Sequence, residues 1–195
     1  ADLLSRLRSL GAEATVQPAI EIAPPPAWEP VDRALVRLDC FDWLVFSSVN
    51  GVDFLLERLK TLDMRPQLFP NLRFAAIGPS TAERLRQWGL EVTVVPPQYR
   101  AESLADLLAE HGAGKRFLLA RASRGREVLA ERLRASGATV EQIVVYTSRD
   151  VRYPEPMVVA MLRAGKCDWA TVTSSAIARS LHAMLGADLD RARLA

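Results

Sequence analysis

The run Asp42-Trp43-Leu44-Val45-Phe46-Ser47-Ser48 decides the fold. Its apolar residues follow one another without alternating with polar ones, which is typical of a strand buried on both faces of a parallel sheet. Residues 49–60 follow at once, with four apolar residues at helical spacing. The stretch therefore predicts a buried strand that leads directly into a crossover helix.

The same alternation of short apolar runs and amphipathic segments continues in both directions. Extended segments are predicted over residues 15–22, 42–48, 72–77, 91–95, 115–120, 139–146 and 168–173. Helices are predicted over residues 2–10, 31–38, 49–60, 78–89, 101–110, 126–135, 155–163 and 176–185. This order predicts the α/β class, with parallel sheets and helices on both faces.

Composition excludes several classes of protein. The chain has 195 residues, 49% hydrophobic and 25% charged, which is ordinary for one or two globular domains. A net charge of +2 gives no strong attraction to nucleic acid or to a membrane surface, and no apolar run approaches the ~20 residues of a membrane span. Cys40 and Cys167 are expected to be buried free thiols in a reducing cytosol, and two cysteines are too few for a disulfide framework.

An internal repeat is visible at a constant offset of 126 residues. Residues 3–12, 29–37 and 42–59 share identities with residues 129–138, 155–163 and 168–185. Three blocks in one register indicate an internal duplication. The counterpart of the strand at 115–120 would precede Ala1, and that of the block at 76–82 would follow Ala195, so we expect the native chain to extend at both ends.

Small polar residues recur where a strand ends and a helix begins. For each one, ordinary helix capping is the simpler interpretation. Together, at the carboxyl edge of parallel strands, they would offer N–H groups and positive helix ends to an anionic ligand. Five nearby arginines could assist, although a solvated side chain is the simpler interpretation of each: Arg121, Arg124, Arg126, Arg149 and Arg152. The candidate binding residues are Ser47, Ser48, Asn50, Gly78, Ser80, Thr81, Ser123, Thr173, Ser174 and Ser175.

Tyr146 has an aromatic hydroxyl late in a predicted strand. It is either a sheet residue with a packed ring or a proton donor that faces a cleft. Trp43 and Trp169 occupy equivalent positions in the repeat and are predicted to be core residues. Dinucleotide, phosphate-loop and serine-hydrolase motifs are absent from the sequence.

The order and spacing of four segments resemble the uroporphyrinogen-III synthase family. These are residues 42–51, the block Ala76-Ile77-Gly78-Pro79-Ser80-Thr81-Ala82, residues 129–146, and residues 168–175. The resemblance covers the whole chain and implies two flavodoxin-like parallel-sheet domains. Residues 1–22 plus 150–195 would form one domain and residues 28–143 the other, joined by extended connectors at 17–27 and 143–153.

The resemblance implies an active site in the cleft between the domains and a cofactor-independent, metal-free hydro-lyase. The substrate would be hydroxymethylbilane, a linear tetrapyrrole polycarboxylate, which the family closes to uroporphyrinogen III with loss of water and inversion of the terminal ring. Tyr146 would be the catalytic residue that assists departure of the hydroxyl, and the strand-end residues would bind substrate. It also implies a cytoplasmic monomer, with a transient partner in the preceding pathway enzyme and neither nucleic acid nor membrane.

One alternative remains open from the sequence. A two-domain sensor that binds a polyanion or a tetrapyrrole without converting it would share the two-lobe organisation. An assay of the isomer ratio formed from hydroxymethylbilane separates the two, because only a synthase favours the type III isomer.

Overall fold

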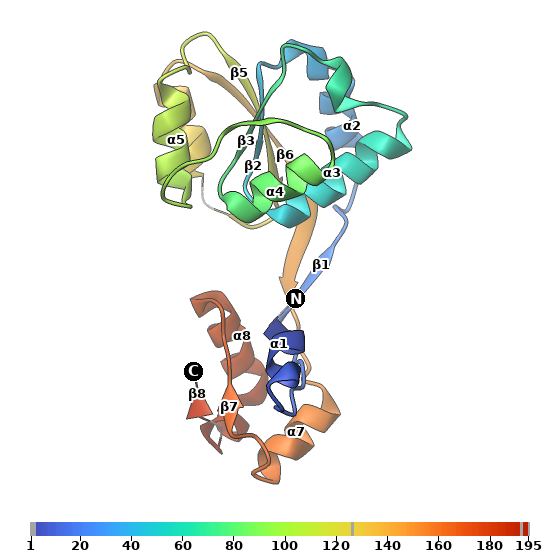
Figure 1. Ribbon diagram of the computed structural model, residues 1–195, viewed down its shortest axis with the longest axis vertical. Helices are drawn as coiled ribbons and strands as arrows, with labels where there is room; N and C mark the ends of the chain where they lie inside the picture. Colours follow the sequence, from blue (N-terminus) through green and yellow to red (C-terminus); the bar gives the residue numbers. More distant parts are fainter. Residues whose placement is uncertain (1–2, 126, 192, 195) are drawn as a thin grey trace. The chain divides into compact units, whose positions relative to one another are not determined.

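The computed structural model describes residues 3–125, 127–191 and 193–194 (Figure 1). The chain forms two compact units, which we call the larger unit, Ala23–Ser148, and the smaller unit, Ala1–Ile22 with Arg149–Ala195. The sequence predicted domains over 28–143 and over 1–22 plus 150–195, with connectors at 17–27 and 143–153. Two strands, β1 (Ile20–Ala23) and β6 (Thr139–Asp150), run through the points where the chain passes from one unit to the other.

A six-stranded sheet organises the larger unit, in the order β1-β6-β5-β2-β3-β4. Its other strands are β2 (Trp43–Phe46), β3 (Arg73–Ala76), β4 (Val92–Val94) and β5 (Arg116–Ala122). Strand β2 lies at the centre and pairs in parallel with β3 and β5, so all four of its residues are buried. The pairs β3–β4 and β5–β6 are parallel as well, which places the carboxyl ends of these strands at one edge.

Helices cover both faces of this sheet. Figure 1 shows α5 (Ala101–Ala109) on one side and α2 (Glu29–Leu35), α3 (Val49–Thr61) and α4 (Pro79–Gln87) on the other. Helix α6 (Val128–Ala135) packs beside α5. Between them and the sheet lies a core in which the rings of Trp43 and Phe117 stack with centroids 6.0 Å apart. The predicted α/β class is confirmed for this unit, with a sheet that is mixed and mostly parallel.

The pairing of β5 with β6 contains one irregularity. Arg121 pairs with Val144, but the next residue, Ala122, pairs with Tyr146 rather than Val145. One extra residue on β6 is the signature of a β-bulge, and it reverses which face the following side chains point to. Tyr146 therefore lies on the same face of the sheet as α3.

The smaller unit consists mainly of helices and has a sheet of two short strands, unlike the larger unit. It contains α1 (Leu3–Ser9), α7 (Pro156–Arg163), α8 (Ser175–Leu185), the 3-10 segment η3 (Gly186–Arg191) and a parallel pair of short strands, β7 (Trp169–Ala170) and β8 (Arg193–Leu194). A small core of Ala19, Leu162, Leu181, Leu185 and Leu189 holds the helices together. Among the described residues this pair is the unit's own sheet, so a second flavodoxin-like domain stays a prediction.

Two expectations about single residues are wrong. Trp169 is 59% exposed rather than in the core, because β7 has two residues and, among the described strands, pairs with β8 alone. Cys40 is exposed and Cys167 is half-buried, although both are free thiols as predicted. Cys40 ends the 3-10 turn η1 (Leu38–Cys40), which lies outside the buried strand that follows it.

Candidate functional site

The site begins where β2 passes into α3 at the carboxyl edge of the sheet. Ser48 has extended backbone angles (φ −162°, ψ 157°), and its side-chain oxygen accepts the N–H of Gly51 at 3.0 Å. This is the bond of a helix N-cap, which satisfies one donor of the first turn. Ser47 and Asn50, on either side, are exposed to solvent at the same edge.

The next strand end along the sheet has a different cap. Gly78 precedes α4 in extended conformation without a side-chain cap, and Pro79 occupies the first turn. Thr81 is buried in that turn, whereas Ser80 is exposed. Tyr99, which the sequence analysis did not single out, lies against Gly78, because a Cβ added there would meet the Tyr99 Cβ at 3.4 Å. This edge therefore carries two tyrosines rather than one.

Tyr146 is held in place by three contacts. Its hydroxyl oxygen lies 3.0 Å from Ser48 Oγ, and its ring stacks on Phe54 of α3 with centroids 5.8 Å apart. Its carbonyl accepts the N–H of Ser123 at 2.9 Å. Ser123 Oγ in turn accepts the N–H of Ser148 at 3.3 Å. Ser123 therefore extends the pairing of β5 with β6 by two hydrogen bonds, in addition to its predicted role as a ligand-binding residue. With these contacts made, Tyr146 is 7% exposed.

Beside Tyr146 lies a pocket of about 280 Å³ whose polar residues include Ser47, Arg121 and Arg124. The side chain of Arg121 is only 19% exposed. It donates hydrogen bonds to Glu127, to Gln142 at 2.9 Å and to the carbonyl of Ala122 at 3.2 Å. These bonds connect β5, β6 and the loop after β5, so the guanidinium forms a fixed positive wall of the pocket.

Glu127 is the counter-charge of that wall. Hydrogen bonds from Gln142 and then from Arg121 hold the pKa of its carboxyl below the ordinary value. It is therefore ionised at neutral pH and offsets part of the charge of Arg121. An anion at this wall would meet a guanidinium that is already oriented by its bonds to Gln142 and Ala122.

The polar residues predicted in the smaller unit lie at the start of α8. Ser174 caps this helix with φ −159° and ψ 156°, and its Oγ accepts the N–H of Ile177 at 3.2 Å. These angles match those of Ser48, which stands 126 residues earlier. Thr173 and Ser175 are exposed on either side of the cap.

Comparison with known proteins identifies the family. The model of the family described as "Uroporphyrinogen-III synthase HemD" matches residues 1–195. The chain belongs to the uroporphyrinogen-III synthase family. It is 32% identical over 187 residues to the uroporphyrinogen-III synthase of Synechococcus elongatus, an alignment that covers 95% of this chain and 70% of the relative. The Escherichia coli uroporphyrinogen-III synthase is 28% identical over 186 residues, covering 94% and 75%.

A solved structure agrees with the fold. A uroporphyrinogen III synthase from the extremely thermophilic bacterium Thermus thermophilus superposes with a TM-score of 0.67 at 18% sequence identity, covering 97% of this chain and 77% of that one. Uroporphyrinogen-III synthases are hydro-lyases of tetrapyrrole biosynthesis, and the resemblance stated from the sequence is confirmed at this level.

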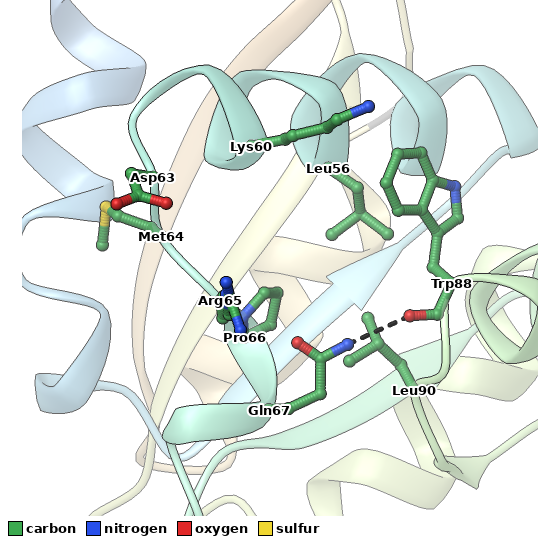
Figure 2. A pocket seen from close by; sticks show the side chains of 9 residues that line it. All are labelled: Leu56, Lys60, Asp63, Met64, Arg65, Pro66, Gln67, Trp88 and Leu90. Atoms are coloured by element: carbon green, nitrogen blue, oxygen red, sulfur yellow. Dashed lines mark hydrogen bonds between the residues drawn. The ribbon is translucent and has the colours of Figure 1, made fainter.

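A second pocket in this family member lies away from the predicted edge. Figure 2 shows this pocket, of about 310 Å³, between the ends of α3 and α4, with Leu56, Lys60, Trp88 and Leu90 among its lining residues. The side-chain amide of Gln67 donates to the Trp88 carbonyl at 3.0 Å across it. The lining segments precede β3 and β4, so the pocket faces the amino ends of the strands. None of the predicted site residues lines it.

Sequence reasoning missed Phe54 and Tyr99. Phe54 is a large apolar residue of α3 that lies outside the helical spacing of the buried apolar residues of this helix. This position was the one signal in the sequence that its ring makes a contact outside the main core. Tyr99 follows β4 in the Pro96-Pro97 loop, where only the strand-end position pointed to the site.

The described part of the chain shows neither a membrane-spanning helix nor a cluster of metal ligands. No described helix has the length and apolarity needed to cross a membrane. Within the same residues, no three His, Cys, Asp or Glu side chains are grouped in a way that could hold a metal ion.

Proposed function

We propose that this member of the uroporphyrinogen-III synthase family closes hydroxymethylbilane to uroporphyrinogen III, with loss of water and inversion of the terminal pyrrole ring. The observation that carries the proposal is the Tyr146 hydroxyl, fixed by Ser48 at the carboxyl edge of the sheet beside a pocket walled by Arg121. A positioned proton donor beside an oriented cation is what a dehydrating enzyme of an acidic substrate needs.

Tyr146 would act in the first chemical step. The bond between the methylene carbon and the hydroxyl breaks, its electron pair stays on oxygen, and the phenol proton completes a water molecule. The pyrrole nitrogen lone pair forms the new double bond, and loss of the pyrrole N–H proton yields the azafulvene and restores the phenol. Attack by the substituted carbon of the terminal pyrrole then gives the spiro intermediate, whose fragmentation and reclosure invert the ring.

The remaining candidates would bind and fold the substrate. The first turns of α3 and α4 present backbone N–H groups and positive helix ends at the edge that carries Ser47, Asn50, Gly78, Ser80 and Thr81. We also assign substrate contacts to Thr173, Ser174 and Ser175 of the smaller unit. Holding several carboxylates sets which pyrrole carbon lies nearer to the azafulvene, and this orientation effect decides the isomer formed.

The organisation implied by the family is part of the same proposal. The smaller unit would belong to a second flavodoxin-like domain, supported by the matched caps at Ser48 and Ser174. We expect a monomer in the cytoplasm that receives its unstable substrate from the preceding enzyme of the pathway during a transient encounter.

Replacing Tyr146 by Phe tests the proposal. We expect kcat to fall about tenfold to hundredfold but not to zero, because substrate folding still operates without the donor. The product of the variant should contain more type I isomer, which forms by spontaneous closure. Tyr153→Phe, at a tyrosine that is exposed in the smaller unit, is the matched control and should keep the parent rate.

The assay also separates the synthase from a binding protein. The chain is incubated with hydroxymethylbilane, and the type III and type I products are resolved by chromatography. A chain that binds hydroxymethylbilane yet leaves the isomer ratio of the spontaneous reaction is a non-catalytic binding module, and the proposal is then wrong.

A further inference from the structure

We propose that Ser48 is a positioning residue for Tyr146, and that its hydroxyl donates a hydrogen bond to the phenolic oxygen. The phenol proton then remains available for the departing hydroxyl of the substrate. The inference rests on the proposed function, in which Tyr146 supplies that proton. It assigns Ser48 a role through Tyr146 rather than in direct substrate binding.

The two bonds of Ser48 Oγ carry this assignment. A serine hydroxyl has one proton to donate and two sites that accept. One site accepts the Gly51 N–H at 3.0 Å, and the Tyr146 hydroxyl lies at the same distance. Accepting a bond from the positive end of α3 polarises the serine hydroxyl and makes it a stronger donor. Of the two directions open to the bond with Tyr146, donation by Ser48 is therefore favoured.

The surroundings leave the phenol little freedom. Phe54 fixes the plane of its ring, and Ser123 fixes its backbone through the carbonyl. At Gly51 a Cβ would lie 3.2 Å from Ser48 Oγ, so the absence of a side chain lets the helix N–H and the serine approach without strain. Helix α3 and its N-cap residue hold the ring and the hydroxyl, and the loop after β5 holds the backbone.

The same geometry argues against Ser48 as a ligand of the substrate carboxylates. A carboxylate can only accept hydrogen bonds, so a ligand of it has to be a donor. In this arrangement the single O–H of Ser48 already donates to Tyr146. After the phenol has given up its proton, the serine hydroxyl stabilises the phenolate by a charge-assisted hydrogen bond. Its contribution therefore belongs to the chemical step and should be seen in kcat.

Three substitutions at Ser48 separate capping from donation. Thr keeps both functions, Asp keeps the cap but has no proton to donate at neutral pH, and Ala has neither. We expect Ser48→Thr to retain the parent kcat, and Ser48→Asp and Ser48→Ala to lose about tenfold, the equivalent of one hydrogen bond. For Ser48→Ala the KM should stay unchanged. If Ser48→Asp kept the parent kcat, Ser48 would be a helix cap and nothing more. If Ser48→Ala raised KM and left kcat unchanged, Ser48 would be a substrate ligand. Either result overturns the inference.

A double-variant cycle tests whether Ser48 acts through Tyr146. In the Tyr146→Phe background, Ser48→Ala should lower kcat by less than about twofold, because residues that act as one unit are not additive. A further tenfold loss in that background would show that Ser48 works independently of the phenol and would refute the positioning role.

Infrared spectroscopy gives a readout that needs no substrate. The phenol C–O stretching band of Tyr146, isolated by subtracting the spectrum of Tyr146→Phe, reports whether the oxygen accepts or donates a hydrogen bond. We expect an acceptor band in the parent and in Ser48→Thr, and its loss in Ser48→Ala. A donor band in the parent would overturn the inference. If the acceptor band is present but Tyr146→Phe keeps full activity and isomer ratio, the bond is as inferred and the proposed role of Tyr146 in catalysis is what fails.

Discussion

The dipeptide Asp-Trp occurs twice, at Asp42-Trp43 and at Asp168-Trp169, and opens a strand both times. Trp43 is 1% exposed and Trp169 is 59% exposed. Strand β2 is flanked by a strand on each side and by helices on both faces, whereas β7 has two residues and pairs with β8 among the described strands. The comparison teaches that burial of these tryptophans depends on the neighbouring layers and not on the local sequence.

The largest expected difference between the two copies is in stability. Trp43→Ala should lower the free energy of unfolding of the larger unit by about 3–5 kcal/mol, because it opens a cavity beside Phe117 in a packed core. Trp169→Ala should cost less than about 0.5 kcal/mol, as is usual for exposed positions. Urea unfolding followed by circular dichroism measures both. Equal losses would show that Trp169 is buried in solution and that the difference between β2 and β7 is not real.

A smaller difference is expected between the two aspartates. Asp42 accepts hydrogen bonds from Lys115 Nζ at 2.8 Å and from the Arg116 N–H at 2.9 Å, which connect β2 with β5. Partial burial acts to raise the pKa of its carboxyl, but these bonds outweigh burial and hold the pKa below the ordinary value. Asp42→Asn should lower the free energy of unfolding by about 1 kcal/mol at pH 7, and the loss is no larger because Lys115 is exposed to solvent. Asp168 is exposed, so Asp168→Asn should lower it by less than about 0.5 kcal/mol.

The pH dependence of that loss has a definite sign. A carboxyl whose pKa is lower in the folded state stabilises the protein above the pKa of the unfolded chain, about 3.9, and this stabilisation disappears as the pH falls through the folded value. The difference between the parent and Asp42→Asn should therefore be full at pH 7 and shrink below about pH 4. A constant difference from pH 7 to pH 3 would contradict the ion pair as its cause.

The smallest difference should be between the two caps. Ser48→Ala and Ser174→Ala each remove an N-cap bond of the same geometry, which is typically worth about 1 kcal/mol. We expect Ser48→Ala to cost more, because the half-buried Ser48 also loses the bond to Tyr146. Thermal unfolding of the two variants gives the comparison. A larger loss for Ser174→Ala would indicate that its environment is more buried than the structure shows.

Most of the larger unit could be predicted from the sequence. Its helices and strands lie within a few residues of the predicted ones, because apolar periodicity and the capping residues Ser48, Gly78 and Pro79 are local signals. The position of Ser48 at the carboxyl edge also follows from local pattern. What could not be predicted are the contacts that depend on register, namely Phe54 on Tyr146 and Tyr99 on Gly78, since one residue of slip changes the face of a strand.

The exposure of Trp169 could not be predicted for a related reason. Repeat identity reports common ancestry of two segments, but burial is a property of everything packed around them. The same holds for Cys40, which ends a turn before the strand rather than lying within it.

The extra residue that β6 carries opposite Ala122 has a consequence for how this family member can change. Because side chains alternate along a strand, removing a single residue between Gln142 and Val145 would transfer the phenol to the opposite helix layer, away from its serine partner. The position of the Tyr146 hydroxyl thus depends on the number of residues that precede it in β6. This short segment of β6 should therefore tolerate substitution of its residues far better than the insertion or deletion of one.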